Sequence, residues 1–146
     1  MMEREKVHHI LSQCNAVITG THVCLTPKAD GWYHSDAYVD KDSATKHPGL
    51  ALDLYSEMTD PWHDKEVEVV VGPATGAIPI AQHVAMELAI NGPSLRDVVA
   101  VYVEPEDPAD KGSRLVFKRG FGRDVKGKRV LAVEDILTSG GSAARI

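Results

Sequence analysis

Three short runs of apolar, mostly β-branched residues constrain the fold more than any other feature of the chain. They cover residues 66–71, 97–103 and 129–133, and they are typical of strands that are buried on both faces. Between the first two runs, apolar residues recur at helical spacing, at Ala77, Ile80, Ala81, Val84, Ala85 and Leu88. Buried strands joined by such a helix predict an α/β fold, in which a parallel sheet has helices on both faces.

A smaller subregion of helix and strand is expected before this core. Residues 3–13 carry apolar side chains at helical spacing, and residues 17–25 form an apolar, β-branched run. A short strand is expected at residues 33–39. A further helix is expected from Pro48, because proline suits the first position of a helix.

Length and composition exclude several classes of protein. With 146 residues, the chain fits one domain, and we expect an N-terminal subregion at residues 1–62 followed by the α/β core at residues 63–146. Sixteen Lys and Arg against 21 Asp and Glu give a net charge of −5, which offers no overall positive field to attract nucleic acid. No apolar run approaches the roughly 20 residues of a membrane span. We therefore expect neither nucleic acid nor a membrane as a partner.

The spacing of cysteines and histidines along the chain does not indicate a metal site. Cys14 and Cys24 do not form a CxxC pair, and the seven histidines form no HxH, HxxH or HExxH pattern. Two reduced, partly buried thiols are typical of a cytoplasmic protein. We therefore expect a cytoplasmic chain without metal-ligating residues of its own.

The most informative stretch follows the third apolar run, where the sequence reads VLAVEDILTSGGSA from Val130. Ligands of open α/β sheets bind at the carboxyl ends of strands, and here the strand ends in the carboxylates of Glu134 and Asp135. The Thr-Ser-Gly-Gly-Ser turn that leads toward a helix from Ala143 offers backbone N–H groups and hydroxyls to an anion. Acceptors for sugar hydroxyls beside donors for a phosphate describe a site for a phosphorylated ribose. The alternative is a charge pair and a helix cap.

The same stretch resembles the signature of type I phosphoribosyltransferases, which use phosphoribosyl pyrophosphate (PRPP). VVVGPATGAIPIA at residues 69–81 resembles the strand, pyrophosphate loop and helix of the orotate members, and residues 21–40 resemble their base-binding segment. LVFKRGFGRDVKGKRVLAVED resembles the lead-in to their ribose motif, so that the similarity covers most of the chain from Gly20 onward. The resemblance implies a type I phosphoribosyltransferase fold. It also implies transfer of the phosphoribosyl group from PRPP to orotate, which gives orotidine 5-phosphate and pyrophosphate in pyrimidine nucleotide biosynthesis.

The resemblance also implies roles for individual residues. The PRPP-binding set is Ala74, Thr75, Gly76, Glu134, Asp135, Ile136, Leu137, Thr138, Ser139, Gly140, Gly141 and Ser142. The base-binding set is Lys28, Ser35, Tyr38 and Thr138. Glu134 and Asp135 would hold the ribose hydroxyls directly or through Mg²⁺ and water, with Mg²⁺ bound mainly through PRPP. Two alternatives stay open: residues 74–76 as a plain strand-to-helix turn, and Tyr38 as a core aromatic.

A basic run precedes the ribose motif. Six basic residues lie between Lys118 and Arg129, with only Asp124 opposing them. Pyrophosphate gains negative charge as its bond to the sugar breaks, so a cation on a mobile loop would stabilise the transition state. Lys118 and Arg119 are the candidates, which makes them catalytic residues together with Glu134 and Asp135. The alternative is a solvated, charged hairpin.

Two features depart from the pattern of the orotate enzymes. Residues 102–107 are acidic where those enzymes carry an Arg-Lys segment, and no arginine can be assigned to the orotate carboxylate. Because the chain stops at Ile146, we expect a C-terminally truncated member with an incomplete PRPP-binding core. The alternatives are a phosphoribosyltransferase for another base, and a non-catalytic PRPP or nucleotide regulator on the same fold. A homodimer is expected, because this family pairs its subunits.

Overall fold

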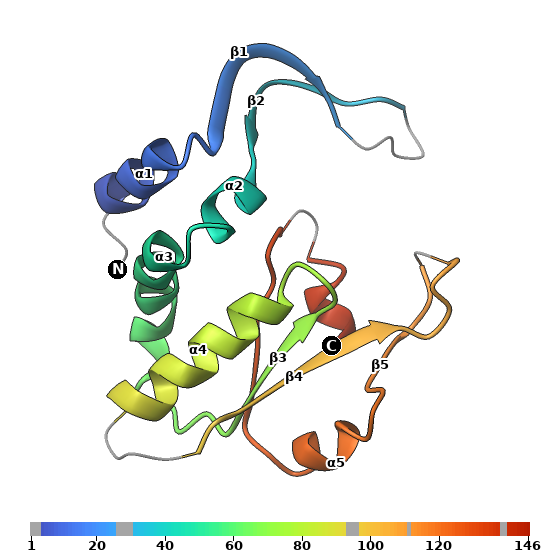
Figure 1. Ribbon diagram of the computed structural model, residues 1–146. Helices are drawn as coiled ribbons and strands as arrows, with labels where there is room; N and C mark the ends of the chain where they lie inside the picture. Colours follow the sequence, from blue (N-terminus) through green and yellow to red (C-terminus); the bar gives the residue numbers. More distant parts are fainter. Residues whose placement is uncertain (1–3, 26–30, 93–96, 111, 138–139) are drawn as a thin grey trace. The chain divides into compact units, whose positions relative to one another are not determined.

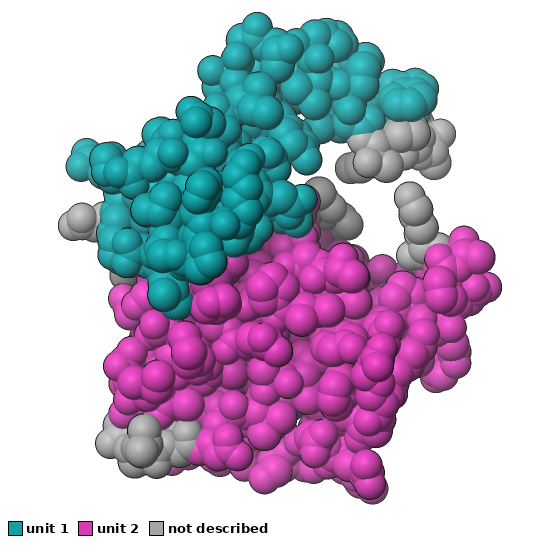
Figure 2. Space-filling model, in the orientation of Figure 1, with its two compact units in different colours: residues 1–54 teal, residues 55–146 magenta. Residues whose placement is uncertain are grey.

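The computed structural model describes residues 4–25, 31–92, 97–110, 112–137 and 140–146 (Figure 1). These residues form two compact units, Met1–Leu54 and Tyr55–Ile146, which Figure 2 distinguishes by colour. The boundary lies inside a helix, and the division into residues 1–62 and 63–146 stays a prediction. Within the described ranges, no helix combines the length and the apolar character needed to cross a membrane.

The first unit contains an antiparallel hairpin between two helical segments. Helix α1 (Arg4–Gln13) precedes strands β1 (Val17–Cys24) and β2 (His34–Val39), which confirms the elements expected there. Val17 lies opposite Val39 and Cys24 lies opposite His34, and the register shifts between Thr19 and Val23. Gly20, which lies within this irregular stretch, has a φ of +71°, a backbone conformation that glycine adopts without steric cost. The short helix α2 (Lys41–Thr45) and the start of α3 (Pro48–Thr59) complete the unit.

Helix α2 was not expected from the sequence, although its capping signal is there. The carboxylate of Asp40 accepts hydrogen bonds from the backbone N–H groups of Asp42 and Ser43. It also accepts one from the Ser43 hydroxyl at 2.6 Å, and this bond is the main reason why the pKa of Asp40 lies below its ordinary value. An Asp N-cap satisfies donors that a helix leaves unpaired at its start. A helix of only five residues carries too little apolar periodicity to be predicted.

The two thiols of this unit differ in burial. Cys14 is 5% exposed and packs with Ala16 and Ala44 in a small core, whereas Cys24 is exposed on β1. Leu11, Leu50 and Leu54 lie against that core. The expectation of two partly buried thiols is therefore wrong for both. Cys14 is buried because it packs inside this small core, and Cys24 is exposed because it lies on a two-stranded hairpin.

The second unit is built on a four-stranded sheet in the order β5-β4-β3-β6. Strand β3 (Val69–Pro73) pairs in parallel with β4 (Val99–Pro105) on one side and with β6 (Val130–Ala132) on the other. Strand β5 (Leu115–Val116) is antiparallel to β4 and forms the edge. Helix α4 (Ile78–Asn91) connects β3 to β4 and packs against both (Figure 1). The predicted α/β class with a parallel sheet is confirmed.

Three short helical segments complete the unit, and the strands begin later than expected. The segments are η1 (Asp60–Trp62), α5 (Gly122–Val125) and η2 (Ala143–Arg145). Strand β3 begins at Val69 and not at residue 66, since Glu66 has a φ of +51° that no strand residue adopts. Its carboxyl end extends to Pro73, so that two residues expected in the turn belong to the strand.

Apolar side chains cover both faces of the sheet. Every residue of β3 is buried, which the run of valines predicted. The α4 residues expected to face the sheet, Ala77 at its N-cap and Ile80, Ala81, Val84, Ala85 and Leu88, are all buried. A cluster of Val69, Val71, Val101 and Val103 is covered by Leu115, Phe117, Phe121, Val125 and Ile146. The segment between β4 and β6 therefore contributes part of the core and is not only a surface loop.

Gly72 permits the close approach between β3 and the turn that follows it. A Cβ at this position would lie 2.6 Å from the carbonyl oxygen of Ala77 and 2.9 Å from its Cβ. We expect Gly72→Ala to lower the free energy of unfolding by about 1–3 kcal/mol, because backbone atoms of a packed core must move to admit the methyl group. Urea denaturation measures this change. The control is Gly49→Ala, where no atom lies within 4 Å of the added Cβ and stability should stay the same or rise slightly.

Candidate functional site

The parallel strands β3, β4 and β6 end at the same edge of the sheet, and the predicted site residues of this unit follow those ends. The backbone N–H of Val133 donates to the carbonyl of Val71 at 2.8 Å, which directs the chain past β6 alongside β3. The N–H of Ala74 donates to the carbonyl of Val103 at 2.8 Å, which holds the turn after β3 against the end of β4. These main-chain bonds bring together segments that lie about 30 to 60 residues apart in sequence.

Glu134 is the most unusual carboxylate at this edge. Its Oε1 accepts a hydrogen bond from the backbone N–H of Asp135 at 3.2 Å, while its Oε2 is buried without a hydrogen-bond partner in the described part of the chain. Burial raises the pKa of the Glu134 carboxyl above its ordinary value, and the Asp135 carboxyl adds to the rise. The Asp135 N–H and the Ser142 hydroxyl act in the opposite direction. A buried acceptor of this kind suits a ligand that brings a hydroxyl or a cation.

A cavity of about 310 Å³ lies beside Glu134. Its lining consists of Glu134, Ile136, Leu137, Gly140, Gly141, Ser142, Ala143 and Arg145. Gly140 has a φ of +76°, a conformation that favours glycine and turns the chain around the cavity. Six of the residues expected to bind PRPP therefore meet at one cavity. Asp135 is half-buried next to Glu134, and Thr138 and Ser139 lie outside the described residues.

After Ser142 the chain forms the 3₁₀ turn η2 (Ala143–Arg145), at the position where the sequence predicts the start of a helix. Arg145 supplies positive charge, and the sequence analysis missed it. Its Nε donates to the carbonyl of Gly141 at 3.0 Å, and its guanidinium also donates to the carbonyl of Ser113 at 3.1 Å. The only sequence signal for this contact is that Arg145 follows Gly141, a glycine of the turn, by four residues.

The expected pyrophosphate loop forms a tight turn at the end of β3. The N–H of Ala77 donates to the carbonyl of Pro73 at 3.3 Å, and the N–H of Ile78 donates to the carbonyl of Thr75 at 3.2 Å. The Ala74–Thr75 peptide is cis, and Thr75 is exposed at the tip of the turn. Ala74, Thr75 and Gly76 thus lie at the same edge of the sheet as Glu134, where α4 begins.

The basic run divides into two parts with different surroundings. Lys118 Nζ donates to the carbonyl of Pro105, the last residue of β4, at 2.9 Å, which places this ammonium at the edge of the sheet where Glu134 lies. Lys128 and Arg129 lie at the opposite edge, where Lys128 Nζ and the backbone N–H of Arg129 each donate to the carboxylate of Glu68 at 3.0 Å. These bonds, with the Arg129 N–H as the largest cause, lower the pKa of Glu68. Lys118 is therefore held at the end of β4, whereas Lys128 and Arg129 lie at the opposite edge from the candidate site, and the role of Lys118 stays a prediction.

The other predicted catalytic cation, Arg119, directly follows Lys118. It is exposed, and its φ of +59° places it in the left-handed region. Such a conformation is uncommon for a residue other than glycine and turns the chain sharply between β5 and α5.

The predicted base-binding residues belong to the first unit. Ser35 and Tyr38 lie on β2, while Lys28 lies outside the described residues. The Ser35 hydroxyl donates to the carbonyl of Ala37 at 2.6 Å. Tyr38 is 41% exposed, so the alternative of a core aromatic is wrong. An exposed ring on a hairpin is available to stack on a planar ligand.

Comparison with known proteins places these features in a family. The model of the phosphoribosyl transferase domain matches residues 40–145. The orotate phosphoribosyltransferase of Caldanaerobacter subterraneus subsp. tengcongensis is 30% identical over 145 residues, which are 99% of this chain and 66% of the relative. That of Methanoculleus marisnigri is 34% identical over 134 residues, which are 92% of this chain and 66% of the relative. The chain therefore spans just under two thirds of the length of these curated relatives.

Solved structures show the same fold. Orotate phosphoribosyltransferase from Aeropyrum pernix superimposes with a TM-score of 0.61 at 24% identity, over 96% of this chain and 71% of that one. The Mycobacterium tuberculosis H37Rv enzyme in complex with inorganic phosphate gives a TM-score of 0.56 at 26% identity, over 96% and 71% of the two chains. With a matching family model over most of its length and a ribose motif at the carboxyl end of β6, the chain belongs to the phosphoribosyl transferase domain family.

Proposed function

We propose that this chain carries the PRPP site of an orotate phosphoribosyltransferase, which forms orotidine 5-phosphate and pyrophosphate from PRPP and orotate in pyrimidine nucleotide biosynthesis. The observation that carries the proposal is the cavity beside Glu134, where a buried carboxylate oxygen lies next to the glycine turn and Ser142. The orotate phosphoribosyltransferases among its relatives support orotate as the base.

The proposed reaction needs no covalent bond to the protein. The base nitrogen attacks the anomeric carbon of PRPP, the bond from that carbon to pyrophosphate breaks, and its electron pair leaves with pyrophosphate. The transition state resembles an oxocarbenium ion, so the protein has to hold both reactants in line, exclude water and stabilise the leaving group. Glu134 and Asp135 hold the ribose hydroxyls, the Gly140–Ser142 turn holds the 5-phosphate, and residues 74–76 hold the pyrophosphate.

Mg²⁺ is the cofactor that this donor set fits. Carboxylate oxygens suit Mg²⁺, and the buried Oε2 of Glu134 accepts no hydrogen bond from the described residues. Glu134 and Asp135 would hold the ion or its waters, while PRPP supplies most of its ligands. The ion bound there would supply positive charge that offsets the negative charge of pyrophosphate. As part of the same proposal, the active protein is a homodimer.

A phosphoribosyltransferase for another base is the second candidate. The segment after β4 is acidic, and Glu106 binds Arg114 at 3.0 Å. The orotate enzymes carry a basic segment at this position. Its replacement by an acidic segment favours a base without a carboxylate, or a regulator that binds PRPP without turnover.

A panel of bases tests the proposed function. Orotate, uracil, adenine and hypoxanthine are each incubated with the chain, PRPP and Mg²⁺, and nucleotide and pyrophosphate are measured. We expect orotidine 5-phosphate with orotate alone. Turnover with another base identifies the second candidate, whereas PRPP binding without any turnover identifies the regulator.

The carboxylate pair should control PRPP affinity. Glu134→Gln and Asp135→Asn keep the shape of each side chain, and each should weaken PRPP binding by about 1.5–3 kcal/mol through loss of a charged hydrogen bond. Calorimetric titration with PRPP and Mg²⁺ measures the loss. Asp97→Asn is the control, because this exposed carboxylate precedes β4 at the opposite edge of the sheet and should not affect binding. Equal affinity of the double variant and the unmodified chain would contradict the assignment.

Unfolding does not explain the expected loss in Glu134→Gln. The raised pKa means that the folded state disfavours the ionised Glu134 carboxylate. The free energy of unfolding therefore falls as the pH rises from the pKa of glutamate in the unfolded chain through the higher pKa of Glu134 in the folded state. Removing that charge should leave the free energy of unfolding at neutral pH unchanged or higher.

Lys118 and Arg119 should act on the leaving group. Lys118→Ala and Arg119→Ala, studied one at a time, should lower kcat with the active base and leave the KM for that base nearly unchanged, because pyrophosphate gains charge only as the bond breaks. Steady-state kinetics with varied base separates the two parameters. Lys126→Ala, an exposed cation of the same run, is the matched control. A change confined to the KM for the base would assign these cations to base binding.

A further inference from the structure

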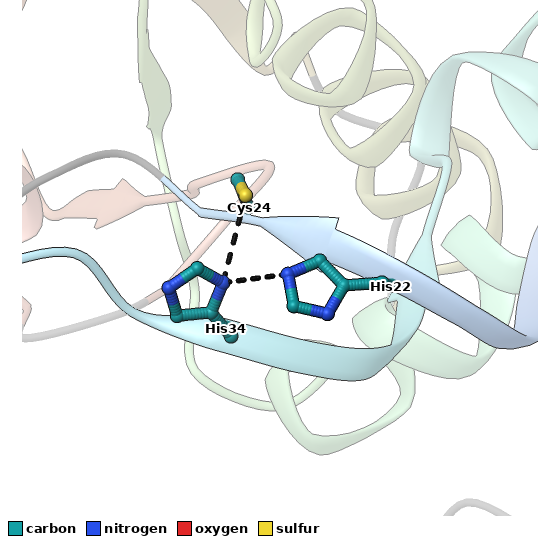
Figure 3. Close-up of side chains that lie close together, drawn as sticks. All are labelled: His22, Cys24 and His34. Carbon is teal, nitrogen blue, oxygen red and sulfur yellow. Dashed lines mark hydrogen bonds between the residues drawn. The ribbon is translucent and has the colours of Figure 1, made fainter.

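Three potential metal ligands lie together on the hairpin of the first unit, and none of them belongs to the set assigned to PRPP. They are His22 and Cys24 on β1 and His34 on β2 (Figure 3). One ligand atom from each lies within 4.8 Å of the other two. His22 Nε2 is 2.8 Å from His34 Nδ1, and Cys24 Sγ is 3.5 Å from the same nitrogen.

The geometry of the hairpin accounts for this cluster. Cys24 lies directly opposite His34, and directly opposed residues in an antiparallel pair point to the same face. His22 lies at the end of the irregular stretch, and its ring reaches the same face, since its Nε2 lies 2.8 Å from His34 Nδ1. Strand pairing therefore brings together a His-x-Cys pair and a histidine ten residues later. The spacing of these residues along the chain does not reveal that they meet.

Two of the three distances are close to those of a tetrahedral ion, and the third pair, His22 and Cys24, lies within 4.8 Å. With bonds of about 2.0–2.1 Å to nitrogen and about 2.3 Å to sulfur, tetrahedral ligands lie about 3.4 Å apart for two nitrogens and about 3.6 Å for nitrogen and sulfur. The 3.5 Å between Cys24 and His34 matches the second value. The 2.8 Å between the two imidazoles is a hydrogen bond, and the rings have to separate by only about 0.6 Å to admit an ion.

We propose that His22, Cys24 and His34 form a binding site for Zn²⁺. Two imidazole nitrogens and a thiolate suit this borderline-soft ion and are poor ligands for Mg²⁺, which prefers oxygen. All three side chains are exposed, so the ion enters freely and water occupies its fourth position. The adjoining cavity of about 500 Å³, lined by His22, His34 and Asp36 among others, provides room for that water.

The ligands of this site are distinct from the residues assigned to PRPP, although Ser35, assigned to the base, directly follows His34 on β2. The three ligands belong to the first unit, whereas the carboxylates, the glycine turn and Lys118 belong to the second. A bound ion connects the last residues of β1 to the first residue of β2. It therefore stabilises the hairpin through linkage, because the unfolded chain does not hold the three ligands together.

Metal titration of the full chain tests the proposal. The chain is treated with EDTA, desalted and titrated with Zn²⁺ in a calorimeter, and Co²⁺ serves as a spectroscopic probe. We expect one Zn²⁺ per chain, a higher melting temperature with Zn²⁺, and a thiolate-to-cobalt charge-transfer band. Zn²⁺ should also protect Cys24 from alkylation, as measured by mass spectrometry of its peptide.

Single variants assign the ligands. His22→Ala, Cys24→Ser and His34→Ala should each weaken Zn²⁺ binding at least about tenfold, because loss of even an outer-sphere partner costs a metal site that much. The cobalt charge-transfer band should disappear in Cys24→Ser. The controls are Cys14→Ser, which keeps Cys24 as the sole thiol, and His9→Ala, an exposed histidine on α1, and both should bind Zn²⁺ as the unmodified chain does. Circular dichroism establishes that each variant is folded.

Two outcomes would overturn the proposal. The first is that His22→Ala and Cys24→Ser bind Zn²⁺ with the same affinity as the unmodified chain. The second is that the cobalt complex shows no thiolate-to-cobalt charge-transfer band. PRPP affinity should be the same in Cys24→Ser and in the unmodified chain, so failure of this site and failure of the proposed function are separate results.

Discussion

The pairing of β3 with β4 and β6 is the constraint on which the rest of the second unit depends. The five residues of β3 are all buried, and the backbone of β3 is hydrogen-bonded to a parallel strand on each side. Parallel neighbours share a carboxyl edge, so the turn after β3, the end of β4 and the Glu134 segment are adjacent. The site is therefore a consequence of strand direction, and the side chains at that edge decide what it binds.

Opposite edges of this sheet use charge in different ways. At the amino edge, the Glu68 carboxylate pairs with the Lys128 ammonium at 3.0 Å and accepts the backbone N–H of Arg129, which connects the starts of β3 and β6 and is a structural use of charge. At the carboxyl edge, the buried oxygen of Glu134 accepts no hydrogen bond from the described residues, and burial raises the pKa of its carboxyl. An acceptor of this kind costs stability in the absence of a ligand, a cost that is common where a site is preformed for binding.

The parts predicted best from the sequence are those whose signal is local. The stripe from Ala77 to Leu88 repeats at helical spacing, and the helix formed with that stripe buried. The run of valines became the central strand, but the strand begins later than expected, because Glu66 has a positive φ and its carbonyl accepts a hydrogen bond from Arg129, which is distant in the sequence. Helix α2 was missed because five residues carry almost no periodicity.

By itself, the sequence determined the α/β class, the buried strands and the ribose motif, because apolar periodicity and a turn signature are written in neighbouring residues. Only the tertiary structure decided which cations of the basic run lie near that motif, since Lys118 binds the end of β4 while Lys128 and Arg129 bind Glu68. It likewise decided that His22, Cys24 and His34 meet, because strand register joins them. Hydrogen bonding between distant segments sets these distances, and no spacing along the chain encodes them.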